Sequence, residues 1–434
     1  MRSKRFLSAL ILCSVCGRAA PLAAKDVQLG RGHRWVRSHP FTTMALTITR
    51  KLDARQYRQA NMTALLAWKA RDVLLQKAVK EGLPWQMHIY PHRQGLTEKL
   101  KANIKRLYDT YPGCTGWMVW DEPKRGEMFV AAPTLAWLRK TYPHTLVYSN
   151  AYPHPPQQMY GGKIPGGQYT CEQYQSDFVN IMKADVLSYD VYPFQEGTGK
   201  LRPIMFLDMA AARTVGLERK VPYWTFVQSY AHKPGGVRMP SESDVRMQVF
   251  AHLTYGFTGI TYFTYWSMVE GGRRPIYYHV ARLNMEVRNV GQALRFLTST
   301  DVGVVFGGGD KLRFGTKAWS PGAGDERITA VTVADRTPGD YKDVLLGFFR
   351  DDSGRRYLMV TNLWHGRGAS AADRRMTVTL HMDRSVRVVG RLSRETGTPE
   401  LLRVSDGKLT LTLPGGTGEL LRFGDAKFPG LSGR

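Results

Sequence analysis

Short apolar runs alternate with longer amphipathic stretches over the first two-thirds of this 434-residue chain. Each run is rich in β-branched and aromatic residues, and each is followed by a segment with helical periodicity. The runs cover residues 43–48, 63–68, 85–90, 116–120, 145–150, 185–192, 223–228 and 259–265. Strands that alternate with helices favour a parallel sheet, and about eight units in about 250 residues match a (β/α)8 barrel.

Helix start and stop signals agree with this alternation. Ser241 and Ser243 can cap a helix before the last run, and Gly82 and Gly256 stand where helices should end. The rival architecture is an open doubly wound sheet. A dinucleotide-binding version of that rival is disfavoured because no glycine-rich phosphate loop follows the first run. Helices are expected at residues 71–81, 98–111, 130–141, 171–183, 203–215 and 242–255.

Helical periodicity stops near residue 300, and alternating apolar and polar positions take its place. These runs cover residues 302–306, 327–333, 344–349, 356–363, 376–382, 386–392, 408–413 and 419–423. Glycine, proline and aspartate turns separate them, which is typical of an all-β sandwich. The expected fold is α/β: a (β/α)8 TIM barrel at residues 25–300, followed by a C-terminal β-sandwich at residues 301–434.

The first 24 residues have the pattern of a signal peptide: a basic start, a short apolar stretch and small residues before a cleavage site after Ala24. This predicts a secreted or periplasmic protein. No stretch approaches the ~20 apolar residues of a membrane span, so no integral membrane association is expected. Of the four cysteines, Cys114 and Cys171 would remain. They could form one bridge, but they are too few for a disulfide framework or a cysteine-based zinc cluster.

The chain is strongly basic, with 61 Lys and Arg against 36 Asp and Glu, for a net charge of +25. No run of basic residues longer than two follows the first five positions, and no nucleic-acid-binding motif occurs. We therefore expect no nucleic-acid partner. The charge favours an anionic substrate or a generally basic surface. Nothing in the sequence determines an oligomeric state.

Two acidic positions stand where a barrel enzyme carries its chemistry, at the carboxyl ends of strands. The fourth run ends in Trp120-Asp121-Glu122-Pro123, where Glu122 is expected to be a catalytic acid or base, and the alternative is that the acidic pair caps a helix. Asp190 lies alone in the apolar sixth run. It could be a second catalytic carboxylate, a ligand of sugar hydroxyls, or the partner of an arginine.

The other strand ends carry polar and aromatic side chains, a combination that suits a carbohydrate. His88 alone is more typical of a buried core histidine, and His88 with His92 lacks further metal ligands. No metal or other cofactor is expected. There is no serine-hydrolase elbow. The candidate sugar-contacting residues are Trp68, His88, Tyr90, Asn150, Tyr192, Gln228, Tyr230, Tyr265 and Trp266.

Four motifs resemble secreted (β/α)8 glycoside hydrolases, particularly the β-galactosidase-like family 42 group: the segments at residues 120–123, 188–194, 224–230 and 259–266. The resemblance implies that Glu122 is the acid/base. In that clan asparagine usually precedes this glutamate, whereas here Asp121 does. The nucleophile is usually a glutamate ending the seventh strand, whereas here Gln228 stands there. The second role would fall to Asp190 or to Glu270 in the loop after the eighth strand.

The leading hypothesis is therefore a glycoside hydrolase that cleaves an O-glycosidic bond in an extracellular oligo- or polysaccharide. Glu122 would donate the proton, Asp190 would act as nucleophile, base or charge stabiliser, and Asp121 would orient Glu122 or bind a hydroxyl. A carboxyl separation of about 5 Å would imply retention, and about 6.5–9.5 Å inversion. The alternative is a non-catalytic carbohydrate-binding barrel, and a third candidate is a polyanion-binding surface protein.

Overall fold

The computed structural model describes residues 29–48, 51–69, 71–154, 156–197, 202, 204–232, 236–307, 313–334 and 341–431. The signal peptide expected at residues 1–24 lies outside this part of the chain.

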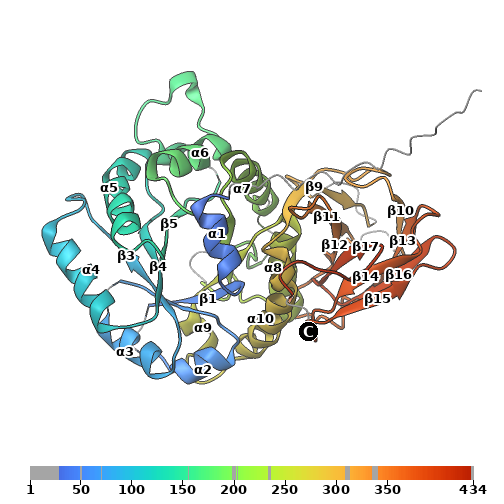
Figure 1. The fold of residues 1–434 in the computed structure, drawn as a ribbon, viewed down its shortest axis with the longest axis horizontal. Coiled ribbons are helices and arrows are strands. Elements are labelled where there is room, and N and C mark those ends of the chain that lie inside the picture. Colours follow the sequence, from blue (N-terminus) through green and yellow to red (C-terminus); the bar gives the residue numbers. More distant parts are fainter. Residues whose placement is uncertain are drawn as a thin grey trace, which may run out of the picture.

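Eight parallel strands close into a barrel, in the order of the sequence (Figure 1). The first strand pairs with both the second and the eighth, which completes the ring. The expected (β/α)8 architecture is thus confirmed. The strands are β1 (Thr42–Thr47), β2 (Leu65–Ala67), β3 (Trp85–Ile89), β4 (Cys114–Asp121), β5 (Leu146–Ala151), β6 (Leu187–Asp190), β7 (Tyr223–Gln228) and β8 (Gly259–Phe263).

Helices follow the strands around the outside of the barrel (Figure 1). The Ser241 hydroxyl accepts a hydrogen bond from the Asp244 N–H, and Gly256, with φ of 98°, ends the same helix. Both signals were expected from the sequence. The helices are α1 (Arg31–Ser38), α2 (Ala54–Gln59), α3 (Asp72–Lys80), α4 (Glu98–Thr110), α5 (Arg125–Thr141), α6 (Cys171–Met182), α7 (Met205–Arg219), α8 (Glu242–Tyr255), α9 (Tyr265–Val269) and α10 (Pro275–Leu294).

Helix α1 covers the end of the barrel where the strands begin. Its Trp35 packs into the barrel interior, with its ring centroid 5.9 Å from that of Trp224 on β7. Arg31 forms an ion pair with Asp185, just before β6. The opposite end of the barrel, where the strands finish, is therefore the place for a site, as in other barrels of this type.

The C-terminal region forms two antiparallel sheets, one of six strands (β15-β14-β17-β12-β11-β9) and one of three (β10-β13-β16). Apolar side chains from both sheets, such as Leu346 and Leu380, meet in a common core. The strands are β9 (Thr298–Val305), β10 (Ile328–Val333), β11 (Val344–Arg350), β12 (Arg356–Asn362), β13 (Met376–Met382), β14 (Val388–Leu392), β15 (Pro399–Arg403), β16 (Lys408–Leu413) and β17 (Gly418–Phe423).

The sandwich packs against the barrel through α8, which lies between β7 and the six-stranded sheet (Figure 1). This position explains why α8 is buried on every side. At Gly347 on β11, a Cβ atom would lie only 2.1 Å from the Thr254 carbonyl oxygen, so only glycine fits this approach. The Thr254 and Thr361 hydroxyls are 2.7 Å apart across the interface. On the barrel side, a buried ion pair joins Arg246 of α8 to Glu286 of α10 at 2.5 Å.

Candidate active site

The backbone at the end of β4 has an unusual conformation that sets the position of two carboxylates. The pairing of β4 with β5 is irregular between Met118 and Asp121. Trp120 and Glu122 have left-handed backbones, with φ of 68° and 48°. Such conformations cost about 1–3 kcal/mol each in non-glycine residues and concentrate at functional sites. The Glu122 N–H is held by the Asn150 carbonyl oxygen at 2.9 Å.

Because of this bulge, neighbouring residues of β4 do not simply alternate between the two faces. The Asp121 and Glu122 carboxyl groups both join one polar cluster with side chains from β5 and β6. The plain alternation of a strand would have brought only one of them to the mouth. A helix-capping role for the pair is not what the structure shows, since Lys124 is the residue that precedes α5.

Asn150 on β5 connects the acidic residues. Its Nδ2 donates to Asp190 Oδ1 at 2.9 Å and to Asp121 Oδ1 at 3.3 Å. Its own Oδ1 accepts a hydrogen bond from the Ser188 hydroxyl at 3.1 Å, which fixes the orientation of the amide. The structure thus brings together three candidate residues from three adjacent strands, and adds Ser188, which lies in the quoted sixth-strand motif.

The Glu122 and Asp190 carboxyl groups are hydrogen-bonded to each other. Burial, followed by the charge of Asp121, raises the pKa of Glu122 to about 7. Burial, followed by the charge of Glu122, raises the pKa of Asp190 to about 8, against hydrogen bonds from Asn150 and Tyr192. Burial and the nearby Asp190 also raise the pKa of Asp121 to about 7.

Two carboxyl groups can share a hydrogen bond only when one of them carries a proton. Near neutral pH the Glu122–Asp190 pair therefore holds one acid and one base side by side. Such a pair can donate a proton to one reacting atom while the partner carboxylate accepts a proton or stabilises positive charge.

Aromatic side chains flank the carboxylates on both sides. Trp68, just after β2, stacks on His88 of β3 with ring centroids 3.9 Å apart. Tyr192 after β6, Tyr230 after β7 and Phe263 at the end of β8 contact one another with centroids 5.0–5.3 Å apart. Trp68, Tyr192, Tyr230 and Phe263 are all partly exposed. Phe263 is a member that the sequence reasoning missed, although it stands in the quoted eighth-strand motif.

Tyr90 is 38% exposed, and its ring centroid lies 4.6 Å from that of Trp120, next to the bulge. His88 is buried, and burial lowers its pKa to about 3, so the ring is neutral. Neither ring nitrogen of His88 has a hydrogen-bond partner among the described residues. His92 is exposed and touches the edge of Tyr90. Within the same part of the chain, His88 and His92 do not belong to a metal-ligating group.

Two predicted sugar-contacting residues lie elsewhere. Gln228 is fully buried, and its amide is occupied by backbone groups: Oε1 accepts the Phe194 N–H at 3.0 Å, and Nε2 donates to the Arg238 carbonyl oxygen at 2.5 Å. Tyr265 is fully buried, and its hydroxyl donates to Gln56 Oε1 at 2.9 Å. In this structure Gln228 joins loop segments, and Tyr265 packs in the core.

The remaining candidates are more peripheral. Trp266 is partly exposed, and Lys51 Nζ lies 5.7 Å from its ring centroid. Glu270 is exposed and forms an ion pair with Arg274 at 2.8 Å. The second carboxylate that meets Glu122 is thus Asp190 and not Glu270.

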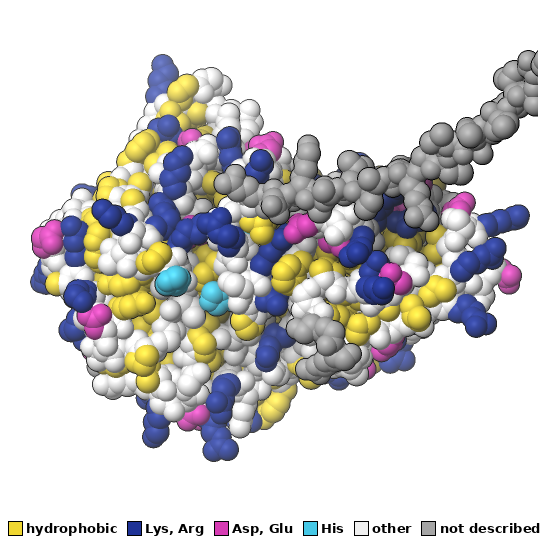
Figure 2. All heavy atoms as spheres, in the orientation of Figure 1, with side chains coloured by type: hydrophobic (Ala, Val, Ile, Leu, Met, Phe, Trp, Pro, Cys, Tyr) yellow, Lys and Arg dark blue, Asp and Glu magenta, His cyan; other side chains and the backbone are white. Residues whose placement is uncertain are grey.

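Charge, cysteines and helices add three observations. Lys and Arg side chains are scattered over both the barrel and the sandwich on the face shown in Figure 2, where acidic side chains are fewer. Cys114 and Cys171 are both free thiols, so the bridge left open by the sequence does not form. In the part of the chain that the structure describes, no helix is both long enough and apolar enough to cross a bilayer.

No protein-family model and no curated protein matches the sequence. Similar solved structures include the GH99 endo-α-mannosidase from Bacteroides thetaiotaomicron, at 12% identity, with 60% of this chain and 81% of that chain covered and a TM-score of 0.37. The β-amylase catalytic domain from Paenibacillus polymyxa is 10% identical, with 56% and 97% covered and a TM-score of 0.37. The chitinase catalytic domain from Pyrococcus furiosus is 12% identical, with 57% and 96% covered and a TM-score of 0.40. The similarity to these glycosidases concerns the fold alone.

Proposed function

We propose that this protein is a glycoside hydrolase in which Glu122 and Asp190 are the two catalytic carboxyl groups. The observation that carries the proposal is their shared hydrogen bond at the carboxyl ends of β4 and β6. A pair that holds one proton near neutral pH supplies the proton donor and the carboxylate that glycosidic cleavage needs. Aromatic rings on both sides offer flat apolar surfaces for the faces of a sugar ring.

The surroundings of the two groups favour different roles. Glu122 is partly exposed, and its side chain is longer than that of Asp190 by one methylene group. Its carboxyl group can therefore reach the glycosidic oxygen and protonate it. Asp190 is buried and receives hydrogen bonds from Asn150 and Tyr192, which favour its charged form, but burial and the charge of Glu122 raise its pKa above that of Glu122. Before substrate binds, the shared proton therefore rests on Asp190, and the proposed roles require it to move to Glu122 when the sugar binds. Asp121 shares the Asn150 amide with Asp190 and adds a negative charge beside Glu122. That charge favours the protonated form of Glu122.

The contact between the two carboxyl groups favours the retaining mechanism over the inverting one. Inverting enzymes keep the groups about 6.5–9.5 Å apart to hold a water, and retaining enzymes about 5–5.5 Å apart. A hydrogen-bonded pair lies nearer the shorter separation. Glu122 then protonates the leaving oxygen as the bond to the anomeric carbon breaks, and an Asp190 oxygen forms an ester with that carbon. Water, deprotonated by Glu122, hydrolyses the ester.

The proposed substrate is an O-glycosidic bond in an extracellular oligo- or polysaccharide, and the net charge of +25 favours an anionic one. The location outside the cytoplasm comes from the N-terminal sequence pattern. Membership of the β-galactosidase-like family 42 group is part of the same proposal. Two features depart from that group: Asp121 before the acid, and a second carboxylate on β6.

The test compares Glu122→Gln and Asp190→Asn with the wild type on aryl glycosides and natural polysaccharides. Each sugar is offered with a poor leaving group, phenol, and a good one, 2,4-dinitrophenol. Glu122→Gln should lose about 10²–10⁴-fold in kcat/KM on the phenyl glycoside and much less on the activated one, which needs no proton. Asp190→Asn should lose activity on both. Glu98→Gln, an exposed change on α4, is the matched control and should behave as the wild type.

Two results would contradict the proposal. If Glu122→Gln turns over the phenyl glycoside at the wild-type rate, the proton donor is wrong. If the wild type binds glycans across the panel by calorimetry but hydrolyses none of them, the protein is a carbohydrate-binding barrel. That alternative rests on Gln228 standing where the resemblance expects a nucleophilic glutamate, and the Gln228 amide is held by backbone groups in this structure.

A further inference from the structure

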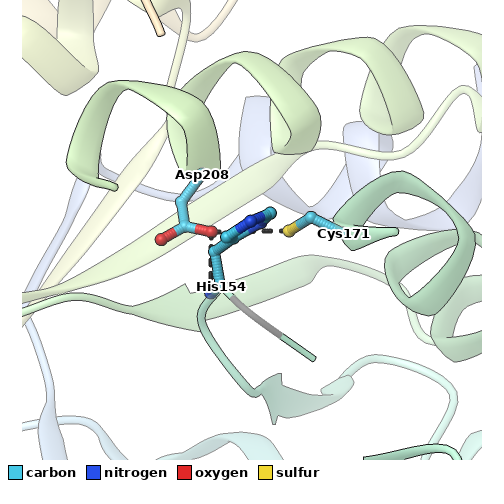
Figure 3. Close-up of side chains that lie close together, drawn as sticks. All are labelled: His154, Cys171 and Asp208. Carbon is cyan, nitrogen blue, oxygen red and sulfur yellow. Dashed lines mark hydrogen bonds between the residues drawn. The ribbon is translucent and has the colours of Figure 1, made fainter. Parts of the chain in front are cut away.

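Three side chains from three separate segments lie close together (Figure 3). His154 follows the end of β5, Cys171 is the first residue of α6, and Asp208 lies in the first turn of α7. Each can offer one ligand atom, and these atoms all lie within 4.8 Å of one another. Figure 3 shows the three side chains directed toward a common point.

The cluster is short of hydrogen-bond partners and of positive charge. Asp208 is fully buried, and its Oδ1 accepts the His154 N–H at 3.0 Å and the Cys171 thiol at 3.4 Å. Asp208 Oδ2 and His154 Nδ1 are buried and have no partner in the described ranges. The charge of Arg202 acts on Asp208, but no Lys or Arg side chain of those ranges forms an ion pair with it. A buried carboxylate oxygen without a direct partner is costly, and a bound cation would provide one.

We propose that His154, Cys171 and Asp208 bind a divalent transition-metal ion, with zinc as the ion that the donor set fits best. Thiolate, imidazole and carboxylate together are zinc ligands, whereas Ca²⁺ and Mg²⁺ require oxygen donors. Zinc bonds of 2.0–2.3 Å in a tetrahedron place ligand atoms about 3.3–3.6 Å apart. The Cys171 Sγ to Asp208 Oδ1 distance of 3.4 Å lies in this range, and the ligand atoms as a set, all within 4.8 Å of one another, would have to draw closer around the ion.

The surroundings of Cys171 support a metal-bound thiolate. The thiol proton leaves as the metal–sulfur bond forms, and the resulting negative charge lies at the N-terminus of α6, where the helix dipole favours it. Gln175 Nε2 lies 3.4 Å from the same sulfur and can donate a hydrogen bond to it. Cys114 has no such setting: its thiol makes one long contact, 3.9 Å to the Gly116 carbonyl oxygen. Cys114 is therefore the natural control.

Three protein ligands leave the fourth tetrahedral position for water or another small ligand. The site would also hold the β5–α6 loop in place next to the carboxylates. In that loop the Tyr152 N–H donates to the Tyr174 hydroxyl at 3.1 Å, and this hydroxyl donates to the Pro123 carbonyl oxygen at 2.9 Å, one residue beyond Glu122. This proposal departs from the sequence expectation that the protein binds no metal.

The test uses the full chain purified without a histidine tag, stripped with a chelator and reloaded with Zn²⁺ or Co²⁺. After gel filtration, the wild type and Cys114→Ser should retain about one zinc ion per chain by mass spectrometry. Their cobalt forms should show a thiolate-to-cobalt charge-transfer band. Cys171→Ser should lose that band, and Asp208→Asn should retain at most a tenth of the zinc at equal free metal concentration.

The proposal is overturned if the wild type retains no zinc after reloading, or if the charge-transfer band persists in Cys171→Ser. It is also overturned if Cys114→Ser loses the band. If the Cys171 variant fails to fold, zinc-edge X-ray absorption on the wild type decides the matter: one sulfur neighbour supports the site, and none rejects it. None of these measurements depends on glycosidase activity, so the two proposals succeed or fail separately.

Discussion

Replacing Asp121 by asparagine should stabilise the protein more at alkaline than at acidic pH. The side chain lies at the bulged end of β4, where burial, followed by the charge of Asp190, raises its pKa from 3.8 to about 7. The folded state therefore holds this proton more tightly than the unfolded state does. Wild-type stability falls as the pH rises through the interval between these two values, because folding then requires a buried charge. Asparagine removes this penalty, and its Oδ1 can still accept the hydrogen bond from Asn150.

The magnitude follows from the same two pKa values. Each tenfold change in proton affinity corresponds to about 1.4 kcal/mol. As Asp121 loses its proton between pH 5 and pH 8, the free energy of unfolding of the wild type therefore falls by about 2.5 kcal/mol. An unfolding entropy of about 2.1 cal/mol/K per residue converts this to about 3 °C when barrel and sandwich unfold together. The Tm advantage of Asp121→Asn over the wild type should therefore grow by about 3 °C between pH 5 and pH 8.

Circular dichroism melts at the two pH values measure this difference. The matched control is Asp109→Asn, at an exposed carboxylate on α4 that pairs with Lys105. Its Tm difference from the wild type should be the same at both pH values. A Tm advantage of Asp121→Asn that stays constant or shrinks toward pH 8 would refute the buried, proton-binding environment on which the site depends.

Three further predictions concern the Glu122–Asp190 pair, the hydrogen bond from Tyr192 to Asp190, and the contact between barrel and sandwich at Gly347. The profile of kcat/KM against pH should be bell-shaped, because the pair is active with one proton, holds two protons at low pH and none at high pH. A flat profile from pH 5 to 9 would contradict a shared proton. Tyr192→Phe should lower kcat about tenfold with little change in KM, because Asp190 loses a hydrogen bond that favours its charged form. The same change should move the acidic side of the kcat/KM profile to higher pH, which steady-state kinetics across the pH range will measure. Gly347→Ala should destabilise the protein by about 1–3 kcal/mol, because the added methyl group would clash with the Thr254 carbonyl oxygen. Gly126→Ala is the control, since Gly126 lies in open space within α5 and the change should not destabilise the protein. Urea unfolding of both variants gives the comparison.

Much of the fold could be predicted because its main signal is periodicity. All eight barrel strands lie within or overlap the apolar runs, since parallel strands buried on both faces are continuously apolar. The strand that the sequence missed is β15, which starts at Pro399 and has no fully buried position. As the edge of the six-stranded sheet it buries little, so it leaves almost no hydrophobic pattern.

The site was predictable only in part. The acidic ends of β4 and β6 identified Glu122 and Asp190, but the bulge that adds Asp121 to the cluster depends on two left-handed backbones that the alternation does not encode. The position at a strand end could not distinguish a mouth-lining side chain from a buried one. Gln228 was therefore assigned to the sugar although backbone groups occupy its amide.

The group of His154, Cys171 and Asp208 had no sequence signal at all. The three residues belong to a loop and two different helices, and they share no spacing that a motif could describe. Only the packing of α6 and α7 against the barrel brings them together. Metal sites of this kind become visible once the tertiary structure is known.

The central claim is that Asp190 and Glu122 together cleave a glycosidic bond. The most direct measurement is to incubate the enzyme with the activated 2-deoxy-2-fluoro derivative of the sugar it hydrolyses, and to map the labelled peptide by mass spectrometry. We expect one covalent label, on Asp190, formed in the wild type and absent from Asp190→Asn. A label on any other carboxylate, or turnover of the parent glycoside with inverted product and no label, would contradict it.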